Sequence, residues 1–169
     1  MQTFFIADTH FGDQRILRYE NRPFPSVEAM DAEMILRWNQ VVSTEDRVYV
    51  LGDFGGNGRE EALLSQLNGT KYLIKGNHDT LPNEAYRAAG FAEVYDLPVL
   101  LNQFWILSHD PLYVCENMPY ANLFGHVHAS PLFKDYSSQH VCVCVERTDY
   151  APISFDALKK MIQEAAQHE

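Results

Sequence analysis

Five short apolar segments of this chain each run into a polar residue that could carry chemistry. They are residues 3–7 before Asp8, 47–51 before Gly52-Asp53, 71–74 before Lys75-Gly76-Asn77-His78, 104–107 before Ser108-His109, and 121–124 before Gly125-His126. Short apolar runs rich in β-branched and aromatic residues are typical of buried strands. We therefore expect buried strands that each deliver a polar side chain at the carboxyl end.

Helical patterns lie between and after these strands. Ser26 is placed to cap a helix over residues 27–40, where Met30, Met34 and Trp38 contribute to a broad apolar face. Further helices are expected over residues 58–67, 81–89 and 154–166, and further strands over residues 97–101 and 141–145. This order predicts an α/β fold with mixed sheets, and the length suits a single domain over residues 1–169.

Charge and hydropathy narrow the possible functions. The formal net charge of −10 disfavours the broad basic surface that binding to extended nucleic acid requires. No apolar run is long enough to span a bilayer, and the first residues lack the basic start of a secretory signal, so we expect a soluble, cytoplasmic protein. Cys115, Cys142 and Cys144 match neither a zinc ribbon nor a redox motif and are expected to be small buried hydrophobic residues.

Two pairs of polar residues share the same spacing. Asp8 and His10 are separated by one residue, and so are His126 and His128. In extended backbone, both side chains of such a pair project to the same side. Carboxylates combined with several imidazoles suit manganese, iron or zinc better than calcium, which prefers oxygen ligands. The pattern therefore indicates a site for transition-metal ions.

Five ordered blocks of the sequence resemble the calcineurin-like metallophosphoesterases. The blocks are Asp8-Thr9-His10, Gly52-Asp53, Gly76-Asn77-His78-Asp79, His109 and Gly125-His126-Val127-His128. Residues 21–24 and 149–154 are similar to segments of small, single-domain bacterial and phage-type members. The resemblance implies a fold of two packed mixed β-sheets flanked by helices. We also expect Gly52, Gly76 and Gly125 to allow sharp turns beside the polar residues.

The resemblance also implies a role for each polar residue. One divalent metal ion would be bound by Asp8, His10 and His128, a second by Asn77, His109 and His126, and Asp53 would bridge the two ions. A hydroxide shared by the metals would attack phosphorus. Manganese is the expected metal, with iron, zinc or nickel as alternatives. His78 would act as general acid toward the leaving group, and Asp79 would orient its ring.

Arginines near the polar blocks are candidates for contact with substrate phosphate. Arg15, Arg18, Arg22 and Arg59 follow two of these blocks, and guanidinium groups bind phosphate through paired donors. Arg22 is the best candidate because it lies in the segment similar to the small members. The alternative for each arginine is a solvated position or a local ion pair.

The expected activity is hydrolysis of a small phosphodiester, such as a nucleotide or cyclic nucleotide. A phosphomonoesterase with the same site is the alternative, and a non-catalytic metal-binding scaffold is the third possibility. The complete ligand set and His78 argue against the scaffold. Gly52-Asp53 lacks the Asp-Arg-Gly continuation of protein serine/threonine phosphatases, which disfavours that branch. Asp13 and Asp110 depart from the family pattern, and His140 and His168 match none of the blocks.

Overall fold

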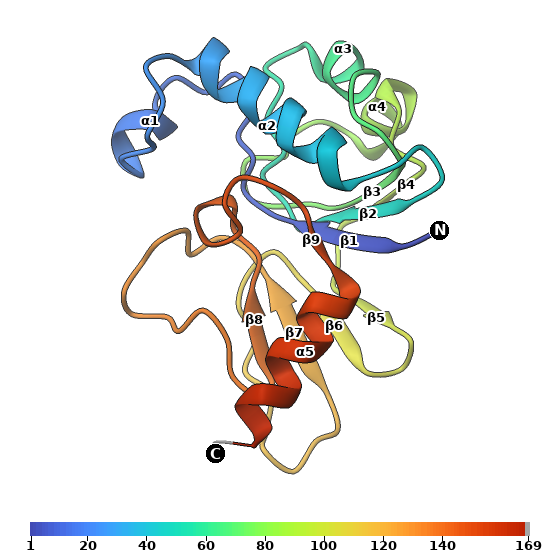
Figure 1. Ribbon diagram of the computed structural model, residues 1–169. Coiled ribbons are helices and arrows are strands. Elements are labelled where there is room, and N and C mark those ends of the chain that lie inside the picture. The colour runs from blue at the N-terminus through green and yellow to red at the C-terminus, as the bar shows by residue number, and fades with distance from the viewer. Residues whose placement is uncertain (168–169) are drawn as a thin grey trace.

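The computed structural model describes residues 1–167, so His168 lies outside the described part of the chain. A five-stranded sheet has the order β4-β3-β2-β1-β9 and a four-stranded sheet the order β5-β6-β7-β8 (Figure 1). The first sheet comprises β1 (Thr3–Ile6), β2 (Arg47–Val50), β3 (Thr70–Ile74), β4 (Glu93–Tyr95) and β9 (Ile153–Ser154). The second sheet comprises β5 (Val99–Leu101), β6 (Trp105–Leu107), β7 (Ala121–Phe124) and β8 (His140–Cys142).

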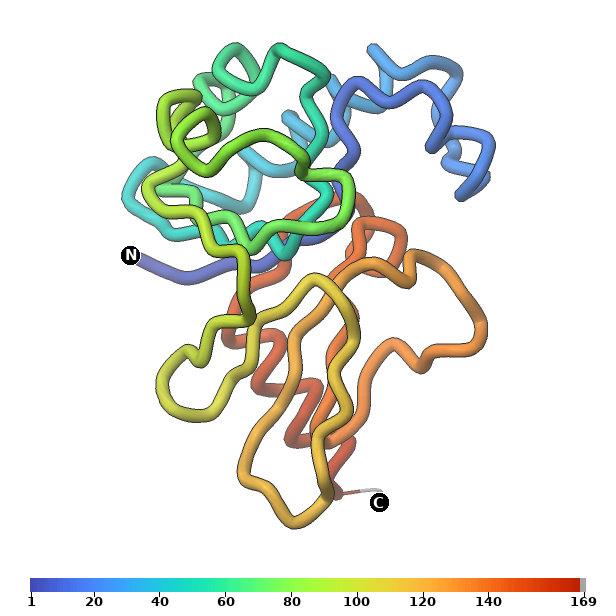
Figure 2. Tube along the Cα trace, turned by 180° about the vertical axis from the view of Figure 1, so that it is seen from behind, coloured from blue at the N-terminus to red at the C-terminus, as the bar shows by residue number. Residues whose placement is uncertain are grey.

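Both sheets are mixed. The strands β1 to β4 pair in parallel, whereas β9 pairs antiparallel with β1. In the second sheet, β6, β7 and β8 are parallel and β5 is antiparallel to β6. Figure 2 shows the chain crossing from the first sheet to the second after β4 and returning toward β9. The predicted fold of two packed mixed sheets with flanking helices is confirmed.

Three helices cover the outer face of the first sheet, and a fourth contributes to the core between the two sheets. On the side away from the second sheet lie α2 (Val27–Val41), α3 (Glu60–Leu64) and α4 (Asn83–Ala89), whereas α5 (Phe155–Ala166) packs against the second sheet (Figure 1). The short helix α1 (Ile16–Tyr19) and the 3₁₀ turn η1 (Val145–Arg147) complete the structure. The Ser26 hydroxyl accepts a hydrogen bond from the Ala29 amide at 3.2 Å, as expected of a helix cap.

Alternate residues of the first sheet contribute to two different cores. Phe4 and Val48 face α2, where they pack in one cluster with Trp38. Their neighbours Phe5 and Tyr49 face the second sheet. Because both faces of this sheet are covered, its strands are apolar almost throughout, which explains the runs that the sequence shows.

Several element boundaries differ from the sequence-based expectation. The strand expected over residues 141–145 ends at Cys142, and the chain then forms η1. Neither α1 nor β4 was expected, because both are too short for a clear periodic pattern. Cys142 and Cys144 are buried as predicted, but the expectation for Cys115 is wrong because this residue is exposed. No helix within residues 1–167 is long and apolar enough to cross a membrane.

Candidate metal centre

The polar residues at the carboxyl ends of the strands meet at one edge of the two sheets. The Asp53 carboxylate, which follows β2, is central: its Oδ2 lies 3.5 Å from His10 Nε2 and 3.5 Å from His109 Nε2. These two histidines follow strands of different sheets. Asp53 therefore stands between two groups of possible ligands.

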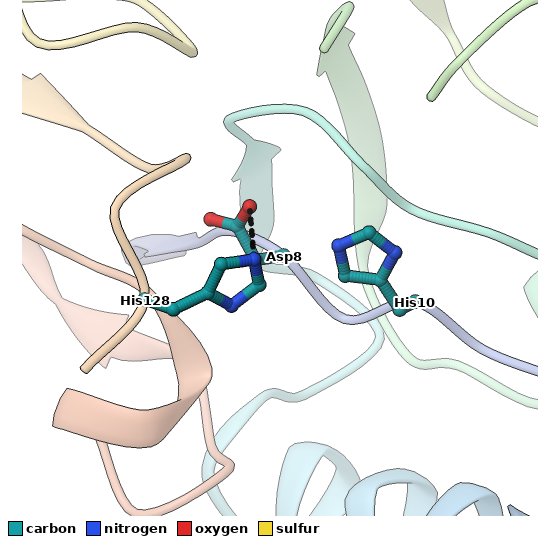
Figure 3. Close-up of side chains that lie close together, drawn as sticks. All are labelled: Asp8, His10 and His128. Carbon is teal, nitrogen blue, oxygen red and sulfur yellow. Dashed lines mark ion pairs between the residues drawn. The ribbon is translucent and has the colours of Figure 1, made fainter. Parts of the chain in front are cut away.

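The first group contains Asp8, His10 and His128. One donor atom from each residue lies within 4.8 Å of the others. His128 approaches Asp8 from a separate segment of the chain, with Nε2 3.7 Å from Asp8 Oδ1 (Figure 3). The His10 and His128 rings are stacked with centroids 5.4 Å apart. Two residues of this group follow β1 in the first sheet, and the third follows β7 in the second.

The second group contains Asn77, His109 and His126. Asn77 Oδ1 lies 3.0 Å from His109 Nε2 and 3.1 Å from His126 Nδ1, and the two nitrogens are 3.1 Å apart. Ligand atoms about 3 Å apart match the edge of an octahedron with metal–ligand bonds of about 2.1 Å. Asn77 follows β3 of the first sheet, whereas His109 and His126 follow β6 and β7 of the second. This group therefore also takes ligand atoms from both sheets.

The orientation of the His109 ring is set by its backbone partner. His109 Nδ1 lies 2.9 Å from the Leu51 carbonyl oxygen, which can only accept a hydrogen bond. Nδ1 therefore donates this hydrogen bond, and Nε2 is the ring nitrogen that faces the second group. A histidine that binds metal typically donates its other ring N–H in this way.

Unpartnered buried atoms test whether a metal ion fits the first group. Within residues 1–167, Asp8 Oδ1 and His10 Nε2 are buried and make no hydrogen bond. Burial raises the pKa of the Asp8 carboxyl to about 6 and lowers the pKa of the His10 ring to about 4, because burial disfavours the charged form of each. A divalent cation would supply the missing partner and favour an ionised Asp8 beside a neutral His10. The donors therefore fit a pair of divalent ions.

The backbone of this region is strained. Asp8, His10 and Asp53 have φ angles of 59°, 48° and 53°, and His126 and His128 have φ angles of 69° and 48°. Left-handed conformations are uncommon for residues with a side chain, and such strain clusters at functional sites. The extended backbone expected for the two spaced pairs is therefore wrong. Their side chains still converge, because the polar residues lie in turns beyond the strand ends.

Three glycines beside the ligands are needed mainly for space. Gly52 has the expected left-handed backbone, with φ of 88°. Gly76 and Gly125 also begin tight turns, in which their carbonyl oxygens accept the amides of Asp79 (3.2 Å) and Val127 (2.8 Å), but neither glycine has a left-handed backbone. A Cβ atom on Gly125 would lie 2.5 Å from Asp8 Oδ2, and one on Gly76 would overlap Asp53 Oδ1. Backbone and carboxylate approach each other here more closely than any side chain would allow.

His78 and Asp79 occupy different environments. His78 is exposed, and its ring packs edge-on against His10 with centroids 5.4 Å apart. Asp79 is buried, and its carboxylate accepts hydrogen bonds from the amides of Asp53 (2.7 Å), Gly76 (2.9 Å) and Phe54 (3.1 Å). Both Asp79 oxygens thus accept backbone amides from the loops after β2 and β3, and the expected orientation of the His78 ring by Asp79 stays a prediction.

The arginines near the site are held mainly by protein groups. Arg15 pairs with Asp13 at 3.1 Å, and Arg59 pairs with Asp31 at 3.1 Å, which are the local ion pairs named above as the alternative. The Arg22 side chain is 0% exposed. This burial argues against the substrate contact expected of Arg22.

Glu146 is a site residue that the sequence analysis missed. Its Oε1 lies 2.7 Å from Arg22 Nη2 and 3.1 Å from His128 Nδ1. Glu146 belongs to none of the recognisable blocks and is separated from Arg22 by 124 positions, so no local signal points to the pair. Only the folded chain reveals this contact.

Comparisons with known proteins agree with this geometry. The sequence profile of the calcineurin-like phosphoesterases matches residues 1–143. The uncharacterized protein MJ1445 of Methanocaldococcus jannaschii is 35% identical, with 95% of this chain and 90% of that protein covered. The Gene 66 protein of Mycobacterium phage L5 is 38% identical over 82 residues, which cover 46% of this chain and 39% of the phage protein.

A solved structure also matches the fold. The protein of unknown function AQ665 from Aquifex aeolicus superposes with a TM-score of 0.72 at 27% identity, covering 95% of this chain and 99% of that one. The chain belongs to the calcineurin-like phosphoesterase family.

Proposed function

We propose that this protein is a metal-dependent phosphoesterase that uses two divalent ions to hydrolyse a small phosphodiester, such as a nucleotide or cyclic nucleotide. The position of Asp53 carries the proposal. One carboxylate oxygen at 3.5 Å from a histidine of each ligand group is suited to bridging two cations. Manganese is the proposed metal, and the carboxylate, amide and imidazole donors are also compatible with iron, zinc or nickel.

The ions and the side chains have separate tasks in this proposal. When bound, two divalent ions supply Lewis acidity, which lowers the pKa of water and stabilises charge on phosphoryl oxygens. Asp8, His10 and His128 would hold one ion, and Asn77, His109 and His126 would hold the other. This division leaves His78 free to serve the leaving group.

His78 is the proposed general acid. Its exposed ring lies against His10 at the rim of the site, where a leaving-group oxygen could receive a proton. The His78 amide also donates to Asp53 Oδ1 at 2.8 Å, which couples the position of the acid to that of the bridging carboxylate.

A pocket beside the ligand-bearing loops supports an organic ester as substrate. Its volume is 490 Å³, and it is lined by Tyr113, Phe124, Phe133, Tyr136 and Lys134 among others. Two of its lining residues are neighbours of candidate ligands in the sequence: Pro111 follows His109 by two positions, and Phe124 precedes His126 by two positions. Aromatic rings and one cation suit a planar base with a nearby negative charge. We therefore favour a nucleotide-like ester over a simple phosphate.

A phosphomonoesterase using the same residues is the second candidate. The His126 side chain is 46% exposed, so the second ligand group is open enough to admit a monoester dianion. A non-catalytic metal-binding scaffold is a weaker candidate, because it would have no need of an exposed His78 beside a complete ligand set.

Parallel assays test the function directly. Metal-stripped protein is reloaded with Mn²⁺ and assayed on nitrophenyl phosphate, bis-nitrophenyl phosphate and 2′,3′-cyclic nucleotides, with Asp53→Asn as the inactive control. We expect the diesters to be hydrolysed faster than the monoester. Faster hydrolysis of the monoester would favour the second candidate, and inactivity on all substrates with weak Mn²⁺ retention would favour the scaffold.

A further inference from the structure

Glu146 and Arg22 form a buried ion pair directly behind the first ligand group. Glu146 Oε1 accepts hydrogen bonds from Arg22 Nε at 2.8 Å and from His128 Nδ1 at 3.1 Å. The side chains of Glu146 and Arg22 are 5% and 0% exposed. The carboxylate thus contacts the ring nitrogen of His128 that faces away from Asp8.

Arg22 connects this carboxylate to the backbone that carries the other two residues of the group. Its Nη2 donates to the Asp8 carbonyl oxygen at 2.6 Å, and its Nη1 donates to the Thr9 carbonyl oxygen at 2.9 Å. Asp8 and His10 are the strained residues on either side of Thr9. One guanidinium therefore holds the strained turn and Glu146 at the same time.

We propose that Glu146 and Arg22 are positioning residues for the first metal ion. Glu146 accepts the hydrogen bond of His128 Nδ1 and so holds the ring with Nε2 directed toward Asp8 Oδ1, and Arg22 fixes the turn from Asp8 to His10. The proposal rests on the proposed function, in which this group binds a metal. Carboxylates behind metal-bound histidines fix the ring and raise its basicity.

The two ligand groups differ in this respect. The corresponding nitrogen of His109 faces a neutral carbonyl, that of Leu51, whereas His128 faces a carboxylate. Glu146 also lies beyond residues 1–143, which the family profile matches. Removing the charge of Glu146 should therefore lower the affinity for the ion of the first group and leave the affinity for the other ion unchanged. A general loss of stability would lower both affinities.

The test measures Mn²⁺ binding by titration calorimetry of the metal-stripped full-length protein. The parent should bind two ions, and Glu146→Gln should bind one of them about 10- to 100-fold more weakly. Asn77→Ala removes a ligand atom of the second group and should leave one tightly bound ion. Adding Glu146→Gln to Asn77→Ala should weaken the binding of that ion, which assigns it to the first group. Glu93→Gln is the matched control, because Glu93 pairs with Arg87 at 2.6 Å away from the ligands.

Parental affinity at both sites in Glu146→Gln would overturn the proposal, whereas absence of Mn²⁺ binding by the parent would overturn the proposed function with it. Should Glu146→Gln not fold, Glu146→Asp replaces it, with the same two outcomes. Nitrogen-15 spectra of the metal-free parent give a second readout that needs no variant. A His128 ring that carries a proton on Nδ1 supports the proposal, and a ring whose only proton is on Nε2 overturns it.

Discussion

The Asp79 carboxylate accepts the backbone N–H of Asp53 at 2.7 Å, so a buried acid fixes the turn that presents the carboxylate proposed as the bridge. The same oxygen also accepts the Gly76 amide, at 2.9 Å. Two segments that follow neighbouring strands, β2 and β3, are thereby joined through one side chain. Asp79 acts on the candidate metal centre through the backbone.

Asp79→Asn tests this role. An amide group has one acceptor oxygen, so at least one backbone N–H would lose its partner and meet an NH₂ group instead. We expect a loss of about 1–3 kcal/mol in the free energy of unfolding and weaker binding of both ions, because Asp53 is the proposed bridge between them. Thermal unfolding and Mn²⁺ titration measure the two effects. Asp156→Asn, at an exposed carboxylate, is the control; unchanged metal binding in Asp79→Asn would refute the role.

His78→Ala tests the proposed general acid. The variant should bind two ions like the parent, because His78 belongs to neither ligand group. Turnover of an alkyl phosphodiester should fall by about 10²- to 10⁴-fold, and turnover of a nitrophenyl ester should fall far less, because nitrophenolate needs no proton to leave. Steady-state rates on the two esters give the comparison within one variant. Equal activity of variant and parent on the alkyl ester would remove His78 from this role.

Gly125→Ala tests the close approach of backbone to ligand. The new methyl group would lie 2.5 Å from Asp8 Oδ2 and 2.6 Å from Ala7 Cβ, so the Asp8 carboxylate must shift. We expect loss of the ion proposed to be bound by Asp8, His10 and His128. We also expect a decrease of about 1–3 kcal/mol in the free energy of unfolding, which is typical of overpacking. Metal content and thermal unfolding are the measurements.

Gly58→Ala is the control for this substitution. A Cβ atom at Gly58 meets nothing within 4 Å, although its φ of +86° is left-handed. It should therefore lose some stability through backbone strain but keep both ions. If Gly125→Ala retains both ions as Gly58→Ala does, the close packing around Asp8 is not required for metal binding.

Phe133→Ala tests the aromatic pocket. Stacking of a base on an aromatic ring is worth about 1–3 kcal/mol, so the KM for a 2′,3′-cyclic nucleotide should rise about tenfold with little change in kcat. Leu100→Ala, on the exposed side of β5, is the control and should leave both constants unchanged. An unchanged KM in Phe133→Ala would count against a base in this pocket.

The strands and the polar residues at their ends could be predicted because both depend on local sequence. Apolar runs such as 47–51 report burial on both faces of a sheet, and the polar residue that follows marks where the strand ends. The roles of Asp79 and Arg22 could not be predicted in the same way. Each depends on partners brought near by folding, namely the Asp53 amide and the Glu146 carboxylate.

The backbone conformation of the ligands was also beyond local reasoning. A spacing of one residue between Asp8 and His10 is compatible with extended and with left-handed backbone alike. The choice is made by contacts between strands, such as the hydrogen bonds from the Asp8 amide to Gly52 and from the His10 amide to Asp53. Spacing and the resemblance to the family therefore predicted which residues are candidate ligands, but not the backbone geometry that brings them together.

Each ligand group takes donors from both sheets, so each bound ion would act as a cross-link between the two halves of the fold. A ligand that binds only the folded state adds RT ln(1 + [L]/Kd) to stability, which is about 2.7 kcal/mol at a hundredfold excess over Kd. The concentration of available metal would then set how long the chain survives as well as how fast it reacts. Under the proposed function, a shortage of metal would lower both the activity of this chain and its resistance to unfolding.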